Sequence, residues 1–216
     1  MNNEWMSISD MMSGLMLIFL FIAIGFMIEV ESEKETMRDI AVSYRDTKAN
    51  LNEALYSEFE DDLSAWNANI TTDNSIVFAS SEVLFAVNSS EVNEKFQTIL
   101  TKFFTRYVKI ITANEYKNEI LELRIEGHTS ATWKDSTSKE EIYLKNMKLS
   151  QNRAYSVLKY CYSLEDQAVK ENRVWLEKHF RANGMAFAKL KENDKARRVE
   201  FRIMLKSESK VYEILK

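Results

Sequence analysis

A long uncharged run near the amino end limits what this 216-residue chain can fold into more than any other feature. Residues 11–28 read MMSGLMLIFLFIAIGFMI and are apolar on every side rather than along one stripe. This length is close to what a helix needs to cross the hydrocarbon core of a bilayer. A cleaved signal peptide fits less well, because no Lys or Arg precedes the run and no small-residue cleavage site follows it. The sequence therefore predicts one transmembrane helix at 11–28.

The segments on the two sides of this span differ greatly in size. Residues 1–10 carry too little charge for the positive-inside rule to decide the orientation. A short cytoplasmic start at 1–10, with Trp5 as an interfacial anchor and the large following part exported, fits the arrangement best. We therefore expect a single-pass protein.

An acid, Asp10, stands at the head of the apolar run, in the string WMSISDMMSGLMLIF. An ionisable side chain in such a place costs a few kcal/mol unless it faces a partner or a water-filled path, so it is a functional candidate. The alternative is an N-cap, in which the carboxylate accepts hydrogen bonds from the first amides of the helix. Position alone leaves both interpretations open.

Residues 29–70 have the composition of a polar helical stalk. Glu, Lys, Asp and Ala dominate, and apolar residues recur three, four or seven positions apart. The apolar positions are Met37, Ile40, Tyr44, Leu51, Leu55, Phe59 and Leu63. Such a narrow stripe is buried well only against another helix, which predicts a dimer through the stalk. The alternative is that the stripe packs on the chain's own domain.

Residues 71–216 are predicted to form one compact α+β domain, a mixed sheet with helices packed on it. Strand patterns and helical patterns alternate along this part of the chain. The expected strands are 76–78, 83–85, 121–126 and 199–205, and the expected helices are 91–107, 149–162 and 174–180. The polar segment 127–143 is expected to be a loop.

Composition and motifs exclude several classes of function. Lys and Arg number 29 against 33 Asp and Glu, so no broad attraction to nucleic acid is expected. The single cysteine, Cys161, cannot form an intrachain disulfide and is expected to be buried. His128 and His179 have no second ligand at metal-binding spacing, and no phosphate loop, zinc motif or nucleophile elbow occurs. The sequence predicts neither enzymatic activity nor a metal or cofactor.

The residues around Asp10 resemble the membrane helix of MotB-like stator proteins. In that family a tryptophan precedes an aspartate, which a Leu- and Met-rich sequence follows. The matching residues are Trp5, Ser9, Asp10, Met11, Met12, Ser13, Leu15 and Phe19.

Three blocks within 75–207 independently resemble the OmpA-like peptidoglycan-binding domain, in the order of that family. They are Gly127-His128-Thr129, then Asn146 with Leu149-Ser150 and Arg153-Ala154, then Arg197-Arg198-Val199-Glu200. Together with the MotB-like start and the sequence GHTSATW, these blocks resemble the ZorB family of stator subunits from Zorya anti-phage systems.

The resemblance implies two sites. Asp10 matches the aspartate that carries the translocated ion, with Ser9 and Ser13 as hydrogen-bonding neighbours. The implied peptidoglycan-binding residues are His128, Ser130, Asn146, Leu149 and Arg153. Arg153 is suited to hold a carboxylate of the stem peptide through a bidentate guanidinium. Its alternative is a structural salt bridge at the helix start.

The chain departs from the family pattern at two positions. Ser130 stands where many members have an aspartate that holds the amine of diaminopimelate. A neutral hydroxyl does not pair with an ammonium as a carboxylate does. Ala196 stands where an asparagine commonly precedes the two arginines, which favours a structural role for Arg197 and Arg198.

The resemblance as a whole implies a peptidoglycan-anchored stator subunit of a proton-driven motor in the bacterial inner membrane, with its carboxyl-terminal domain in the periplasm. It implies a homodimer inside a ring of a MotA- or ZorA-like multi-span membrane protein. A flagellar-type MotB stator and a passive OmpA-like cell-wall anchor, with Asp10 only as a cap, are the alternatives. A sensor of cell-wall state fits less well, because the residues before the span are too few for a cytoplasmic output.

Overall fold

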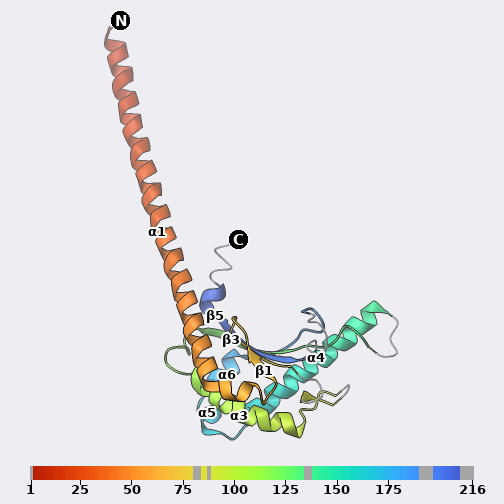
Figure 1. Ribbon diagram of the computed structural model, residues 1–216. Coiled ribbons are helices and arrows are strands. Elements are labelled where there is room, and N and C mark those ends of the chain that lie inside the picture. The colour runs from red at the N-terminus through yellow and green to blue at the C-terminus, as the bar shows by residue number, and fades with distance from the viewer. Residues whose placement is uncertain (1, 80–83, 87–88, 134–137, 190–196, 210–216) are drawn as a thin grey trace.

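One long helix dominates the shape of the molecule. The computed structural model describes residues 2–79, 84–86, 89–133, 138–189 and 197–209, with side chains from residue 9 onward. Helix α1 (Asn2–Leu63) is continuous and extends from the domain as a rod (Figure 1). No proline interrupts it, because the chain has none. At the rise of an α-helix, the part between residues 28 and 51 is about 35 Å long.

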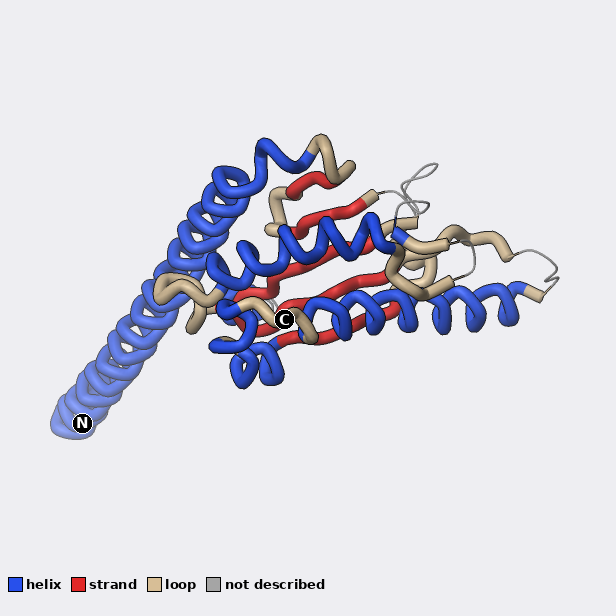
Figure 2. Tube along the Cα trace, turned by 90° about the horizontal axis from the view of Figure 1, so that it is seen from below, coloured by secondary structure: helices blue, strands red, loops and turns tan. Residues whose placement is uncertain are grey.

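The domain at the carboxyl end of this rod is a five-stranded sheet with helices across one face (Figure 2). The strands are β1 (Ala68–Ile70), β2 (Ser75–Phe78), β3 (Ile120–Gly127), β4 (Phe180–Gly184) and β5 (Val199–Leu205). Their order is β1-β2-β5-β3-β4, and β3 and β4 form the one parallel pair among these strands. The helices that follow α1 are α3 (Glu94–Ile111), α4 (Lys139–Tyr162), α5 (Gln167–Glu171) and α6 (Arg173–His179), and residues 206–209 form one further helical turn after β5.

The last turns of α1 belong to the core of this domain. Leu51, Leu55 and Phe59 recur every four residues on one face of the helix and are each 0% exposed. The ring of Phe59 lies 5.2 Å from that of Phe103 on α3, and Phe103 lies 4.9 Å from Phe201 on β5. A chain of aromatic contacts therefore joins α1 through α3 to the middle of the sheet.

Polar contacts hold the same part of α1 to the turn between β1 and β2. The side-chain amide of Asn52 donates to the carbonyl oxygen of Thr71 at 2.9 Å and to Oδ1 of Asn74 at 2.7 Å. Asn74 in turn donates from Nδ2 to the carbonyl oxygen of Lys48 at 3.1 Å. The rod is thus fixed to the domain by both its apolar and its polar faces.

Two glycines allow α4 to lie close against the parallel strands. A Cβ atom at Gly127 would lie 2.2 Å from the carbonyl oxygen of Ser150, and one at Gly184 would lie 2.7 Å from the backbone nitrogen of Gln151. Such contacts with backbone atoms leave no room for a side chain. The glycines therefore set the distance between α4 and the ends of β3 and β4.

The structure confirms the predicted α+β class and most of the predicted elements. The expected strands 76–78, 121–126 and 199–205 correspond to β2, β3 and β5. The strand expected at 83–85 is wrong in its described part, because Phe85 forms only an isolated bridge with Val92. Residue 83 itself lies outside the described residues.

The loop expected at 127–143 is wrong at its end, because α4 already begins at Lys139. The first turns of α4 extend past the strands in Figure 2, so they need no apolar stripe facing a sheet. Strands β1 and β4 and helix α5 were not predicted. Each has at most five residues, too few to show a period.

Candidate functional sites

Asp10 lies inside α1 rather than at its start. Because the helix begins at Asn2, the N-cap interpretation of Asp10 is wrong. Ser9 and Asp10 are exposed in the isolated chain, and the hydroxyl of Ser13 donates to the carbonyl oxygen of Ser9 at 2.9 Å. Ser13 thus uses its hydroxyl hydrogen within the helix, whereas the carboxylate of Asp10 makes no hydrogen bond or ion pair with the described residues.

The apolar segment after Asp10 is exposed on every side. Met16 is 75% exposed and Phe21 is 69% exposed. The segment is long and apolar enough to cross a membrane once, and none of its most apolar window is buried against the described part of the chain. An apolar surface of this extent is stable only in lipid or against other membrane proteins.

Helix α4 brings three predicted ligand residues onto one side. Asn146, Leu149 and Arg153 are three and four positions apart, so they lie on neighbouring ridges of the helix. Asn146 is 2% exposed and Arg153 is 6% exposed, while Leu149 is partly exposed. The side-chain amide of Asn146 donates to the carbonyl oxygen of Ile142 at 3.0 Å, which fixes its orientation.

The guanidinium of Arg153 is held in place without a counter-charge. Its Nε donates to the carbonyl oxygen of Ser89 at 3.0 Å, and its Cζ lies 4.9 Å from the ring centroid of Phe85. Among the described residues no carboxylate lies at ion-pair distance, so the salt-bridge alternative has no support there. Burial, together with the nearby positive charge of Arg197, lowers the pKa of Arg153 to about 10. The residue is therefore cationic at neutral pH and suited to receive an anion.

The segment after β3 lies beside this part of α4. The backbone nitrogen of Thr129 donates to the carbonyl oxygen of Ala186 at 2.8 Å, and Ala186 N donates to the hydroxyl of Ser150 on α4 at 3.0 Å. Ser130 is partly exposed, and its Oγ lies 3.4 Å from Oγ1 of Thr132. Ser130 therefore has an accessible but neutral hydroxyl at this position, and its predicted role in peptidoglycan binding stays a prediction.

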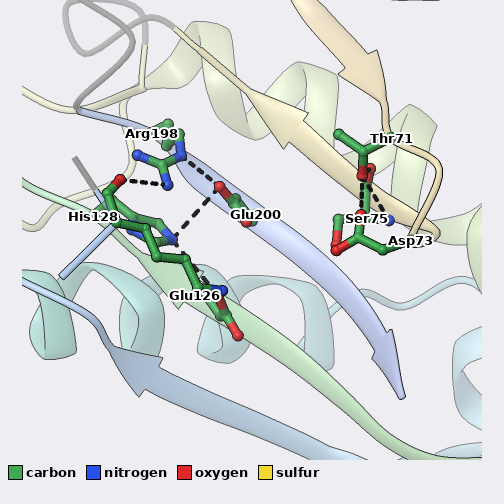
Figure 3. Close-up of polar contacts among 8 residues, drawn as sticks. Thr71, Asp73, Ser75, Glu126, His128, Arg198 and Glu200 are labelled. Carbon is green, nitrogen blue, oxygen red and sulfur yellow. Dashed lines mark hydrogen bonds and ion pairs between the residues drawn. The ribbon is translucent and has the colours of Figure 1, made fainter. Parts of the chain in front are cut away.

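His128 is 1% exposed and faces the interior of the domain, away from solvent. It belongs to a buried charge cluster, made of Glu126, His128, Arg198 and Glu200 (Figure 3). The exposed Lys189 is ion-paired with Glu126 from outside the cluster. The Nε2 atom of His128 lies 3.7 Å from a carboxylate oxygen of each glutamate. The imidazole of His128 therefore contacts Glu126 and Glu200 inside the domain, and its ring is not accessible to a ligand from solvent.

The register of the sheet explains why this cluster needs cations. Glu126 and Glu200 lie directly opposite each other on β3 and β5, a like-charge pair that is destabilising by itself. Arg198 donates from Nε to Glu200, and Lys189 Nζ lies 3.4 Å from Glu126. Burial alone raises the pKa of Glu126, but the neighbouring His128, Lys189 and Arg202 together lower it to about 2.

The cluster has the donor types of a metal site, since its imidazole and carboxylate donor atoms all lie within 4.8 Å of one another. However, the oxygen of Glu200 that faces His128 already accepts from Arg198, and Lys189 balances Glu126. A dication would have to compete with both cations. The arrangement is better explained as an ion-pair network that holds the ends of β3 and β5 together.

Sequence reasoning did not identify Glu126 and Glu200 as partners. Both strands alternate, as LELRIEG and VEFRIML, and each has an acid within the alternation. The signal was present, but a single sequence does not give the register that places these two acids opposite each other. Phe85 and Ser89, which hold Arg153, were missed because they lie in an irregular segment.

One known family matches the domain that follows α1, and one known protein is similar over almost the entire chain. Residues 84–199 match the OmpA family. The whole chain is 36% identical to Zorya protein ZorB of Escherichia coli, strain Crooks, over 99% of this chain and 93% of that protein. The chain belongs to the ZorB family. Within this ZorB-family chain, the OmpA-family match covers α3, α4 and the sheet from β3 to the start of β5.

Two solved structures are similar to the ZorB-family chain at low identity. A MotB-like protein from Desulfovibrio vulgaris is 17% identical, with a TM-score of 0.49, over 78% of this chain and 94% of that one. The cell wall anchor of the T6SS from Pseudomonas aeruginosa is 20% identical, with a TM-score of 0.46, over 70% of this chain and 97% of that one.

Proposed function

We propose that the chain is the peptidoglycan-anchored stator subunit of a proton-driven motor in the bacterial inner membrane, acting in anti-phage defence. The observation that carries the proposal is the continuity of α1, which joins an acid in an apolar segment to the core of an OmpA-family domain. In this arrangement residues 1–10 are cytoplasmic, 11–28 span the membrane, 29–70 form the stalk and 71–216 form the periplasmic domain. The part of the stalk from Leu51 onward packs into that domain, to which strand β1 also belongs. The chain acts without enzymatic chemistry of its own.

At the membrane end, Asp10 carries the translocated proton. The exposed apolar side chains around the helix support burial in lipid and against other subunits, which we propose to be a second copy and a ring of a MotA- or ZorA-like multi-span protein. Asp10 alternates between its protonated and charged forms as protons pass. Each charge that crosses the membrane supplies about 2.3 kcal/mol per 100 mV. Ser9 and Ser13 supply hydrogen-bonding oxygens next to the acid.

At the wall end, Arg153 binds a carboxylate of the peptidoglycan stem peptide. Its buried guanidinium is already oriented by Ser89 and Phe85, so little conformational entropy is lost on binding. Asn146 and Leu149 line the same side of α4. Ser130 contributes a hydroxyl in place of the usual acid, so the amine of the stem peptide gains no ion pair at this position.

The test is phage plating on cells that express the complete defence operon. Asp10→Asn cannot cycle a proton and Arg153→Ala cannot hold the carboxylate, so both variants should protect no better than an empty vector. Asp39→Asn and Arg45→Ala are the matched controls, because both residues are exposed on α1 beyond the apolar segment. Both controls should protect like wild type, and blotting of membranes checks that every variant is present.

Each variant contradicts a different part of the proposal. Protection by Asp10→Asn at a normal membrane level would leave a passive anchor as the better account. Protection by Arg153→Ala, combined with unchanged sedimentation of the protein with purified sacculi, would remove Arg153 from the wall site. Loss of protection in the two controls would show that the assay does not separate the proposed sites from the rest of α1.

A further inference from the structure

Trp133 lies in the segment between β3 and α4, three residues after Ser130, and is partly exposed. The Nζ atom of Lys145 on α4 lies over its ring, 5.9 Å from the centroid. Lys145 is in turn ion-paired with Glu141, one helical turn earlier, at 2.6 Å. A cation over an aromatic face orients the ring, so Trp133 is held against the first half of α4.

The position of Lys145 places Trp133 in line with the proposed wall site. Lys145, Leu149 and Arg153 are four residues apart and therefore form one ridge along α4. Each step along the ridge is about 6 Å, so Lys145 lies about 12 Å from Arg153 along the helix axis. The first turns of α4 extend past the ends of the strands (Figure 2), and Lys145 and Leu149 at this end of the ridge are partly exposed.

We infer that Trp133 is a sugar-binding subsite, which stacks on a pyranose ring of the peptidoglycan glycan strand while Arg153 holds the stem-peptide carboxylate. This inference rests on the proposed peptidoglycan binding. The face of a pyranose is lined by C–H groups, which pack against the flat, electron-rich face of an indole. Trp133 is partly exposed, so part of its ring surface is accessible beside the ridge.

The rise of α4 from Lys145 to Arg153 is close to the length of the stem peptide. The stem peptide begins at the sugar, and three extended residues cover at most about 11 Å. This is close to the distance along α4 between the partner of Trp133 and Arg153. A sugar at Trp133 therefore leaves the carboxylate of the third stem residue within reach of Arg153. The sugar contact also adds binding energy that Ser130, without a negative charge, does not supply.

The test is calorimetric titration of the full chain in detergent micelles with two probes. One probe is the free stem tripeptide, and the other is the same tripeptide attached to its disaccharide. Trp133→Ala should raise the Kd of the disaccharide probe about tenfold and leave that of the free tripeptide unchanged. Trp133→Leu should behave in the same way, since it keeps an apolar side chain without an aromatic face, whereas Trp133→Tyr should bind both probes nearly as wild type does.

Trp175→Ala is the matched control, because Trp175 is also partly exposed but stacks on His179, which contacts Leu121 near the other end of β3. It should bind both probes like wild type. Equal weakening of both probes by Trp133→Leu, or no weakening of either, overturns the sugar subsite. Undiminished binding of both probes by Arg153→Ala instead overturns the proposed wall site, so the two failures are distinguishable.

Discussion

The two ends of α1 have apolar side chains in opposite surroundings, although they are parts of one helix. Near the start, Met16 and Phe21 are 75% and 69% exposed, whereas Leu55 and Phe59 near the end are completely buried. The last turns of α1 pack against other parts of the chain, whereas the apolar segment near its start packs against none of the described residues. The domain can therefore be stable by itself, while the apolar segment at residues 11–28 has no packing partner among the described residues. The difference separates residues that stabilise the domain from residues that the described part of the chain leaves exposed.

Replacing one phenylalanine at each end tests this contrast most strongly. Phe59→Ala should lower the free energy of unfolding of the domain by about 3–5 kcal/mol, because it opens a cavity among the rings of Trp66 and Phe103. Phe21→Ala should leave that free energy unchanged, because Phe21 is 69% exposed and is not buried against the described part of the domain. The measurement is urea unfolding of the full chain in detergent, followed by tryptophan fluorescence. Equal effects of the two changes would show that the ends are not independent.

Charged groups extend the contrast to the interior of the domain. The pKa of Glu126 is lowered from 4.5 to about 2, so its carboxylate stabilises the folded state at every pH above about 4.5. This stabilisation is lost as the pH falls from 4.5 towards 2, because the folded state then takes up a proton that the unfolded chain already holds. The shift corresponds to a free energy on the order of 3 kcal/mol. Urea unfolding of Glu126→Gln between pH 7 and pH 3 should therefore show a smaller loss of stability on acidification than wild type.

Glu122→Gln is the matched control on the same strand. Glu122 is 26% exposed and accepts from Arg124 at 2.6 Å, so this change should cost less than about 1 kcal/mol at any pH. If Glu126→Gln has the same acid sensitivity as wild type, the buried charge cluster is not the source of the pH dependence.

Features that depend on hydrophobic period and residue type could be predicted from the sequence alone. The apolar run at 11–28, the alternating strands and the α+β class all followed from local patterns that tertiary structure preserves. Arg153 was also found, through its resemblance to a family motif. Its isolation from carboxylates was not, because that depends on which side chains the fold brings within ion-pair distance.

Two sequence interpretations of single residues needed the structure to be decided. Asp10 was equally consistent with a cap until the start of α1 at Asn2 was known. His128 was placed in a polar loop, but the paired ends of β3 and β5 bury it between two glutamates. In both cases the residue type was informative, while its role depended on where an element begins or how two strands pair. Neither property can be read from one sequence.

The smallest expected effect concerns the ion pairs on the two parts of α1. Arg106 on α3 donates to Glu58 at 2.5 Å and to Asp62 at 2.6 Å, and its Cζ lies 4.8 Å from the ring centroid of Phe59. Arg45, on the exposed part of the helix, contacts only the neighbouring Asp46 among the residues described. Arg106→Ala should lower the free energy of unfolding by about 1–2 kcal/mol, and Arg45→Ala by less than about 0.5 kcal/mol.

The same urea titration measures both changes, and added salt gives a further comparison. Because Arg106 is two-thirds buried and binds two acids at once, its contribution should fall only slightly at high ionic strength. Since Arg106 fixes the last turns of α1 to α3, its loss also loosens the connection between the membrane segment and the wall-binding domain. Arg106→Ala should therefore weaken phage protection more than its effect on stability alone explains, whereas unchanged protection would show that the aromatic packing of Phe59 suffices to transmit force along the rod.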